Sequence, residues 1–173
     1  MKNFTLHPFD ADSDLKLSGS ISRSNNRLCL TYDLFDERSQ VLIPAAKSPT
    51  RQNNLWQTTC FEFFLGVQNS PQYWEFNLSP SGDWNIYRFE NYRTGMQEEL
   101  KFTSLPFEIN VKAKQVSLTI ELDLNSIIQP DQPLDVSITT VIETSPQNIT
   151  YWALQHCGTE ADFHLRESFV LKL

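Results

Sequence analysis

Residues 109–123 read INVKAKQVSLTIELD, and this stretch indicates the fold class. In its second half an apolar residue occupies every second position, with polar residues between: Val116, Leu118, Ile120 and Leu122. In an extended strand, successive side chains point to opposite faces, so this alternation puts all the apolar residues on one face. Because polar residues 112–115 interrupt the alternation, the stretch predicts a β-hairpin with one face in the core.

The same alternation extends outward from this hairpin over most of the chain. Residues 15–34 repeat it around a turn-prone segment at 23–26, and residues 134–142 and 169–173 continue it. Only residues 124–129 could hold a short helical turn, and Pro130 and Pro133 prevent it from extending. The pattern predicts an all-β protein: a jelly-roll-like antiparallel β-sandwich of about nine to eleven strands, with at most one or two short helical turns.

Length and composition limit the classes of protein and partner. A chain of 173 residues predicts a single domain, 1–173, and 12 Phe, 5 Tyr and 4 Trp supply a large core. The net charge of −7 disfavours nucleic acids and anionic membranes as partners. The sequence shows no signal peptide or apolar span, so we expect a cytoplasmic protein. The sequence leaves open whether the chain forms a homo-oligomer.

Residues 51–96 differ from the rest because both faces of their expected strands carry large or charged groups. Strand parity assigns one set to the core: Phe61, Phe63, Trp74, Phe76 and Trp84. The other set shares a second face: Cys60, Glu62, Phe64, Tyr73, Glu75, Asn77, Asn85, Tyr87 and Phe89. Rings that cover sugar C–H faces, beside carboxylates and amides that bind hydroxyls, are typical of saccharide recognition. The alternative is a solvated polar face with cross-strand pairs.

Two strings in this block resemble a known superfamily. Residues 51–64, RQNNLWQTTCFEFF, and residues 73–87, YWEFNLSPSGDWNIY, are similar to the DOMON-like superfamily, which includes family nine carbohydrate-binding modules. Residues 151–156, YWALQH, and 162–164, DFH, resemble its stand-alone bacterial members. The resemblance implies a β-sandwich whose concave face binds a sugar, or a haem in the redox members.

The resemblance also implies candidate ligand-binding residues. Two tryptophans sandwich a sugar in the glycan-binding members, and Trp56 and Trp152 match these positions, although the alternation also allows Trp152 in the core. Glu62 matches the acidic position, and Asn77 and Arg88 match polar ones. Tyr87 on the second face and Arg51 at the start of the motif complete the set. The predicted function is noncatalytic binding of a small saccharide or polyol-like ligand.

Other functions stay open beside this one. A haem-binding redox module would use Met96 with His156 or His164, although we expect no cofactor and no other metal site, since the three cysteines lack ligand spacing. A hydrolase would use Glu62 with Glu75 or Glu90 as a carboxylate pair, but no catalytic residue is assigned. A structural or assembly domain without a small ligand is the third alternative.

Overall fold

Twelve β-strands make up most of the computed structural model, which describes residues 1–10, 13–144 and 148–173. The first six are β1 (Lys2–Pro8), β2 (Lys16–Ser24), β3 (Arg27–Phe35), β4 (Cys60–Val67), β5 (Tyr73–Leu78) and β6 (Trp84–Phe89). The others are β7 (Gln97–Glu98), β8 (Phe107–Lys112), β9 (Gln115–Asp123), β10 (Leu134–Thr144), β11 (Asn148–Ala153) and β12 (Leu171–Lys172). Two one-turn 3₁₀ helices accompany them, η1 (Leu55–Gln57) and η2 (Arg166–Ser168).

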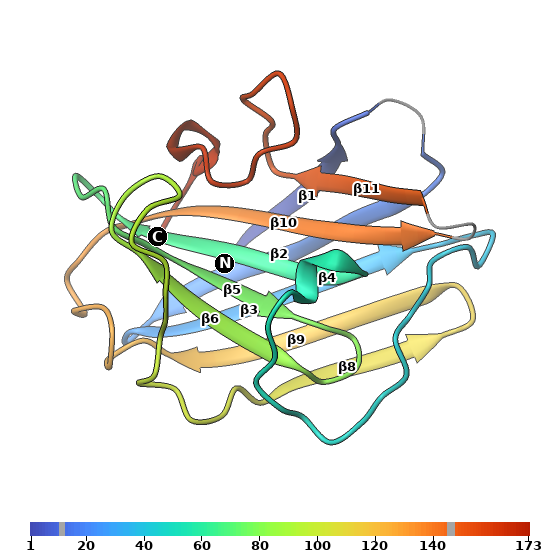
Figure 1. The fold of residues 1–173 in the computed structure, drawn as a ribbon, viewed down its shortest axis with the longest axis horizontal. Helices are drawn as coiled ribbons and strands as arrows, with labels where there is room; N and C mark the ends of the chain where they lie inside the picture. The colour runs from blue at the N-terminus through green and yellow to red at the C-terminus, as the bar shows by residue number, and fades with distance from the viewer. Residues whose placement is uncertain (11–12, 145–147) are drawn as a thin grey trace.

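The strands form one antiparallel path that folds into two layers (Figure 1). Its order is β7-β6-β5-β4-β10-β11-β1-β2-β3-β9-β8, with β12 beside β10. Strand β1 pairs with β2 along its length and with β11 at its end, where His7 faces Ala153. The seam between β1 and β11 therefore joins the two layers, and the expected all-β sandwich is confirmed.

The core lies between the layers and follows the predicted alternation. Phe61, Phe63 and Phe76 are fully buried there, and the rings of Phe63 and Phe76 stack at 4.3 Å. The hydroxyl of Tyr32 in β3 crosses the core and donates a hydrogen bond to the backbone carbonyl of Glu62 in β4 at 2.6 Å. This bond ties one layer to the backbone of the other.

Local differences from the sequence expectations concern short elements. Strand β1 was not expected, because only Phe4 and Leu6 turn inward from it. Residues 41–43 contribute a single bridge, between Val41 and Thr144. Residues 124–129 form one hydrogen-bonded turn, in which the Ile128 N–H donates to the Leu124 carbonyl at 2.9 Å, and two further one-turn helices lie at η1 and η2.

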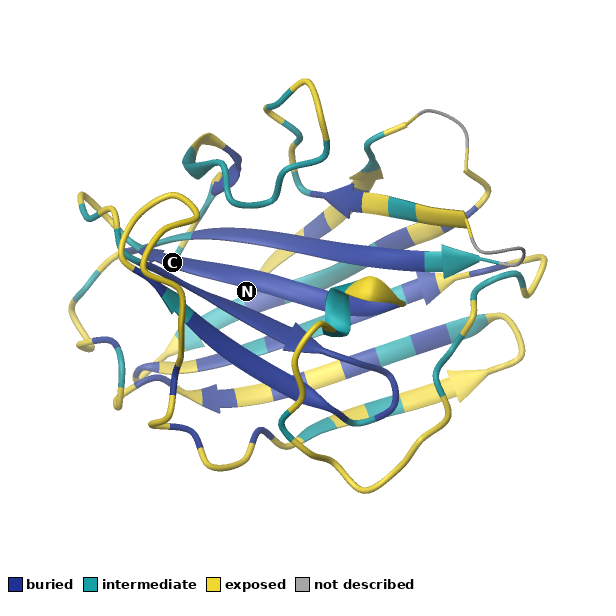
Figure 2. Cartoon of the chain, in the orientation of Figure 1, coloured by how far each residue is buried: buried dark blue, intermediate teal, exposed yellow. Residues whose placement is uncertain are grey.

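One layer is covered on both of its faces. In Figure 2, β5 is dark blue throughout and β4, β6 and β10 are dark blue over most of their length, whereas β8 and β9 include many exposed positions. We use the name second face for the side of this layer that carries Glu62, Phe64, Tyr73 and Tyr87 and points away from the core. Over it lie η1, the loop between β6 and β7, and the segment that follows β11. No helix in the described ranges is long and apolar enough to cross a bilayer.

Candidate ligand-binding site

A cavity of about 410 Å³ lies on the second face. Its rings come from several elements: Trp56 of η1, Phe64 of β4, Phe89 of β6, Tyr151 of β11 and Phe163. Its polar side chains are Glu62, Glu75, Arg93 and His164. The strands supply the floor, while η1, the β6–β7 loop and the segment after β11 supply the walls. We call this space the second-face cavity.

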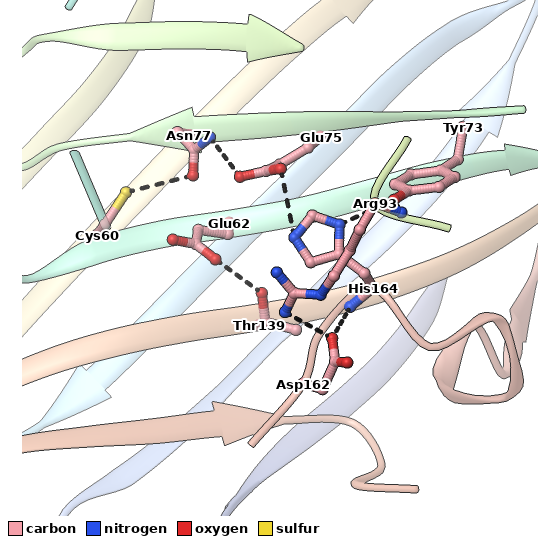
Figure 3. Close-up of polar contacts among 9 residues, drawn as sticks. All are labelled: Cys60, Glu62, Tyr73, Glu75, Asn77, Arg93, Thr139, Asp162 and His164. Atoms are coloured by element: carbon pink, nitrogen blue, oxygen red, sulfur yellow. Dashed lines mark hydrogen bonds and ion pairs between the residues drawn. The ribbon is translucent and has the colours of Figure 1, made fainter. Parts of the chain in front are cut away.

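Two carboxyl groups form the polar part of the floor (Figure 3). Glu62 in β4 pairs with Asn77 in β5, so Glu75, two residues before Asn77, is its diagonal neighbour on the same face. The Asn77 amide donates to Glu75 Oε1 at 2.8 Å, and the Thr139 hydroxyl donates weakly to Glu62 Oε2 at 3.4 Å. Glu62 Oε1 is buried without a hydrogen-bond partner among the described residues.

Burial changes the protonation of both carboxyls. Desolvation, followed by the charge of Glu75, raises the pKa of Glu62 well above its usual range. Desolvation raises the pKa of Glu75 to about 7, although the Asn77 hydrogen bond opposes this change. Both groups therefore keep a proton at pH values where an exposed glutamate has lost it.

His164 closes the floor from the segment after β11. Its Nδ1 shares a 2.9 Å hydrogen bond with the Tyr73 hydroxyl, and its Nε2 lies 3.8 Å from Glu75 Oε2. Burial lowers the pKa of His164 to about 4, and the charge of Arg93 adds to this effect. The imidazole is therefore neutral at physiological pH and does not neutralise Glu75.

Asp162 connects the two loops at the rim. Its Oδ1 accepts from the Arg93 guanidinium at 2.9 Å and from the His164 backbone N–H at 2.9 Å. Its Oδ2 accepts from the Tyr92 hydroxyl at 2.6 Å. We call this set of contacts, made by Tyr92, Arg93, Asp162 and His164, the rim latch. It fixes the β6–β7 loop against the segment that carries Phe163.

The structure brings part of the predicted residue set to the cavity. Trp56 and Glu62 line it. Asn77 lies fully buried beside the floor and orients Glu75. Tyr87 packs edge-on against Trp56 at 5.8 Å and donates a hydrogen bond to Asn53. These two residues support the lining rather than forming it.

The other three predicted residues lie elsewhere. Trp152 is 2% exposed in the core, where its indole N–H donates to Thr150, so it does not face Trp56 across a groove. Arg88 has the parity of the core-facing residues in β6 and reaches Gln97 at the sheet edge. Arg51 covers the Trp84 ring at 4.3 Å and donates to the carbonyls of Glu99 and Phe102. Arg88 thus joins β6 to β7, and Arg51 holds the segment after β7 against the sheet.

Several residues of the cavity were absent from the predicted set. Glu75 could have been added from parity, since it shares a face with Tyr73 and Asn77. Alternation within residues 58–90 gives no indication of Arg93, Tyr151 or Phe163. These residues reach the cavity because the loops fold over the sheet and β11 pairs with β10. Met96 and His164, named as haem ligands, both line the cavity, whereas His156 binds the His7 carbonyl at 2.9 Å. Within the described ranges, no three His, Cys, Asp or Glu side chains gather as a metal site.

Comparison with known proteins relates this chain to others through its structure alone. No protein-family model and no curated protein matches the sequence. A candidate carbohydrate-binding protein from Bacteroides uniformis ATCC 8492 has a TM-score of 0.62 and 10% identity, over 95% of this chain and 84% of its own.

Two structures of family nine carbohydrate-binding modules from Caldicellulosiruptor kristjanssonii are also similar. The complex with cellotriose has a TM-score of 0.55 and 10% identity, over 88% of this chain and 72% of its own. The complex with glucose has a TM-score of 0.50 and 12% identity, over 83% of this chain and 69% of its own. At such identities the similarity shows a shared fold, and this chain therefore has a fold found in family nine carbohydrate-binding modules.

Proposed function

We propose that the protein binds a small saccharide or polyol-like ligand in the second-face cavity. The observation that carries this proposal is a cavity of about 410 Å³ in which aromatic rings surround two buried carboxyls. Its volume lies within the range of small-molecule sites, and its mixture of apolar walls and few polar groups is characteristic of them. The fold shared with carbohydrate-binding modules supports the same ligand class.

The walls and the floor would contact different parts of such a ligand. The rings approach the cavity from different sides. Trp56 lies beside β4 and β5, whereas Tyr151 lies in β11, two strand positions from β4, and packs against Phe163. Rings of this kind cover the C–H surfaces of a sugar. Glu62 Oε1 and Glu75 would accept hydrogen bonds from the hydroxyls of the sugar. Such a bond would supply the partner that Glu62 Oε1 lacks.

We propose binding rather than hydrolysis as the role of the carboxyl pair. A glycosidase needs one carboxylate ionised while the other stays protonated. Burial raises the pKa of Glu75 to about 7 and that of Glu62 well above its usual range, so both carboxyls hold their protons below about pH 7. In that range neither is ionised to act as a nucleophile or base.

Haem is a second candidate, because Met96 and His164 line the same cavity. Iron ligation requires a ring nitrogen with a free lone pair. Both nitrogens of His164 face protein groups, Nδ1 the Tyr73 hydroxyl at 2.9 Å and Nε2 the Glu75 carboxyl at 3.8 Å. The propionates of a haem would also approach two buried carboxyls. The residues present do not fit haem, and we favour the saccharide.

We also propose membership of the DOMON-like superfamily, within which the chain would be a stand-alone binding domain. This finer assignment depends on the strings at residues 51–64 and 73–87. These strings place Trp56 at the wall of the cavity and Glu62 and Glu75 on its floor.

Calorimetric titration with a panel of mono- and disaccharides, amino sugars included, tests the proposed function. We expect dissociation constants in the micromolar to millimolar range for at least one sugar, and a loss of at least about tenfold in Trp56→Ala, because stacking on the ring is removed. Phe35→Ala is the matched control, since Phe35 is an exposed ring at the end of β3, outside the cavity lining. No binding to any sugar, or equal loss in both variants, would contradict the proposal.

A further inference from the structure

We propose that the ligand of the second-face cavity carries a protonated amine, which Glu62 and Glu75 bind together at the cavity floor. The ligand class is then an amino sugar or an aminated polyol. This inference rests on the proposed function and adds a charge to its ligand.

The first argument is that no protein cation forms an ion pair with the two carboxyls in the described residues. The side-chain donors that reach these carboxyls are the Asn77 amide, the Thr139 hydroxyl and the Cys60 thiol, all neutral. His164 lies 3.8 Å from Glu75, but burial lowers the pKa of its imidazole to about 4. Arg93 lines the cavity and its charge lowers the pKa of Glu75, yet its guanidinium is paired with Asp162 at 2.9 Å. Within the described chain no lysine or arginine forms an ion pair with either glutamate.

The second argument is an unsatisfied acceptor. Glu62 is 2% exposed, lines the cavity, and leaves Oε1 without a partner in the described part of the protein. A buried polar atom without a hydrogen bond is rare in native proteins and costs free energy. A donor on the ligand would remove that cost. An ammonium group provides three hydrogen-bond donors and a positive charge, whereas a hydroxyl provides one donor and no charge.

The third argument concerns the surroundings of the pair. Glu62 and Glu75 are diagonal neighbours on adjacent strands, so one small group between them can contact both carboxyls. Trp56, Phe64, Phe89 and Phe163 line the same space, and the faces of aromatic rings attract cations in desolvated sites. Rings around two uncompensated carboxyls are therefore more complementary to an ammonium than to a neutral hydroxyl.

Proton release follows from this arrangement. The titratable and charged groups on the same side of the sheet as the pair are Cys60 of β4, Tyr73 of β5, Tyr87 of β6, and Arg93, Asp162 and His164 of the loops. Tyr32 of β3 approaches Glu62 from the core side. An ammonium favours ionised carboxyls, so its binding at pH 6 should expel protons from the pair. A neutral sugar should expel none. The affinity for the amine should therefore rise with pH until the amine itself loses its proton.

Calorimetry with matched ligands tests the inference on the natural chain. The probes are glucosamine, glucose and N-acetylglucosamine, with galactosamine and galactose as a second pair. We expect each free amine to bind at least about tenfold more tightly than its neutral parent and its acetylated form, because charge-assisted hydrogen bonds are the stronger ones. Titration in two buffers of different ionisation enthalpy should show proton release for the amines only.

A variant separates the carboxyl pair from general effects. Glu75→Gln should lower the affinity for glucosamine about tenfold more than the affinity for glucose, since it removes a charge and little volume. Glu108→Gln, at an exposed position in β8, should leave both affinities unchanged. Circular dichroism verifies that each variant folds, and the ligand comparison on the natural chain stands without them.

The outcomes distinguish the two proposals. Neutral sugars that bind as tightly as their amines, without proton release, overturn the inference and leave the proposed function in place. No binding of any sugar or amino sugar overturns both. Equal binding of glucosamine and cyclohexylamine, a ring amine without hydroxyls, overturns the saccharide class.

Discussion

At the scale of single residues, Glu75 and His164 affect the pH dependence of stability in opposite directions. Burial raises the pKa of Glu75 from 4.5 to about 7, so between these values the folded state holds a proton that the unfolded state has released, and stability falls as pH rises. Burial lowers the pKa of His164 from 6.5 to about 4, so stability falls as pH falls through that window. The two effects oppose each other between pH 4.5 and 6.5.

Comparison of Glu75→Gln with the natural chain isolates the glutamate. From pH 4.5 to pH 7.5 the free energy of unfolding of the variant should rise relative to that of the natural chain by on the order of 2 kcal/mol, because glutamine has no proton to lose. Urea unfolding at several pH values measures the difference. A flat difference for Glu75→Gln would refute the assignment of a raised pKa.

Residue-level prediction succeeded where strand parity decides the outcome and failed where tertiary packing does. Parity separated Phe61 and Phe63 from Phe64 and Tyr73, and the structure confirms this division. The same rule placed Trp152 with Leu154, but the family resemblance favoured a role in the site. In the structure Trp152 packs in the core, because β11 presents Tyr151 to the second face instead. Where the two arguments differed, periodicity was the better guide.

At the scale of elements, the hairpins were predictable and the covering loops were not. Residues 15–34 and 109–123 encode β2–β3 and β8–β9 through alternation and short polar turns, both of which act locally. Loop residues 90–96 and 154–165 have no periodicity. Their positions depend on contacts such as Arg93 with Asp162, which join segments far apart in sequence. This is why the floor of the site could be inferred in part, and its walls could not.

The rim latch should control the order of these walls. Asp162→Ala removes the acceptor for the Arg93 guanidinium, the Tyr92 hydroxyl and the His164 backbone N–H. We expect faster amide hydrogen exchange in residues 158–165 and 91–95, and little change in β4 and β5, whose backbone bonds are independent of Asp162.

Asp131→Ala is the control for the latch, because Asp131 is an acidic loop residue that lines a different pocket. Exchange that stays unchanged in Asp162→Ala, or that rises equally throughout the sheet, would show that the latch does not hold the walls. Hydrogen exchange followed by mass spectrometry gives the segment-level readout.

At the scale of the whole molecule, a buried hydrogen bond links the two layers beside the site. Tyr32 of one layer donates to the Glu62 carbonyl of the other at 2.6 Å. The side chain of that same glutamate lines the cavity on the opposite side of the sheet. Packing between the layers and the position of the floor are therefore linked at β4.

Tyr32→Phe tests this link. The variant leaves a buried carbonyl without its side-chain donor, so we expect the free energy of unfolding to fall by about 1–3 kcal/mol. Tyr151→Phe, which changes a tyrosine that is 38% exposed, should have an effect below about 0.5 kcal/mol. Denaturant unfolding of both variants decides the question, and equal effects would argue against a contribution from the contact between layers.

The seam between β1 and β11 has a consequence for the time at which the cavity can form. His156 binds the carbonyl of His7 across 149 residues of sequence, and such distant contacts close slowly after local hairpins have formed. Strands β4, β5 and β6 are neighbours in sequence and can pair early, whereas β10, β11 and His164 are synthesised long afterwards. A growing chain would thus expose the carboxyls of its floor before the walls arrive, and the cavity would be complete only once residue 164 has left the ribosome.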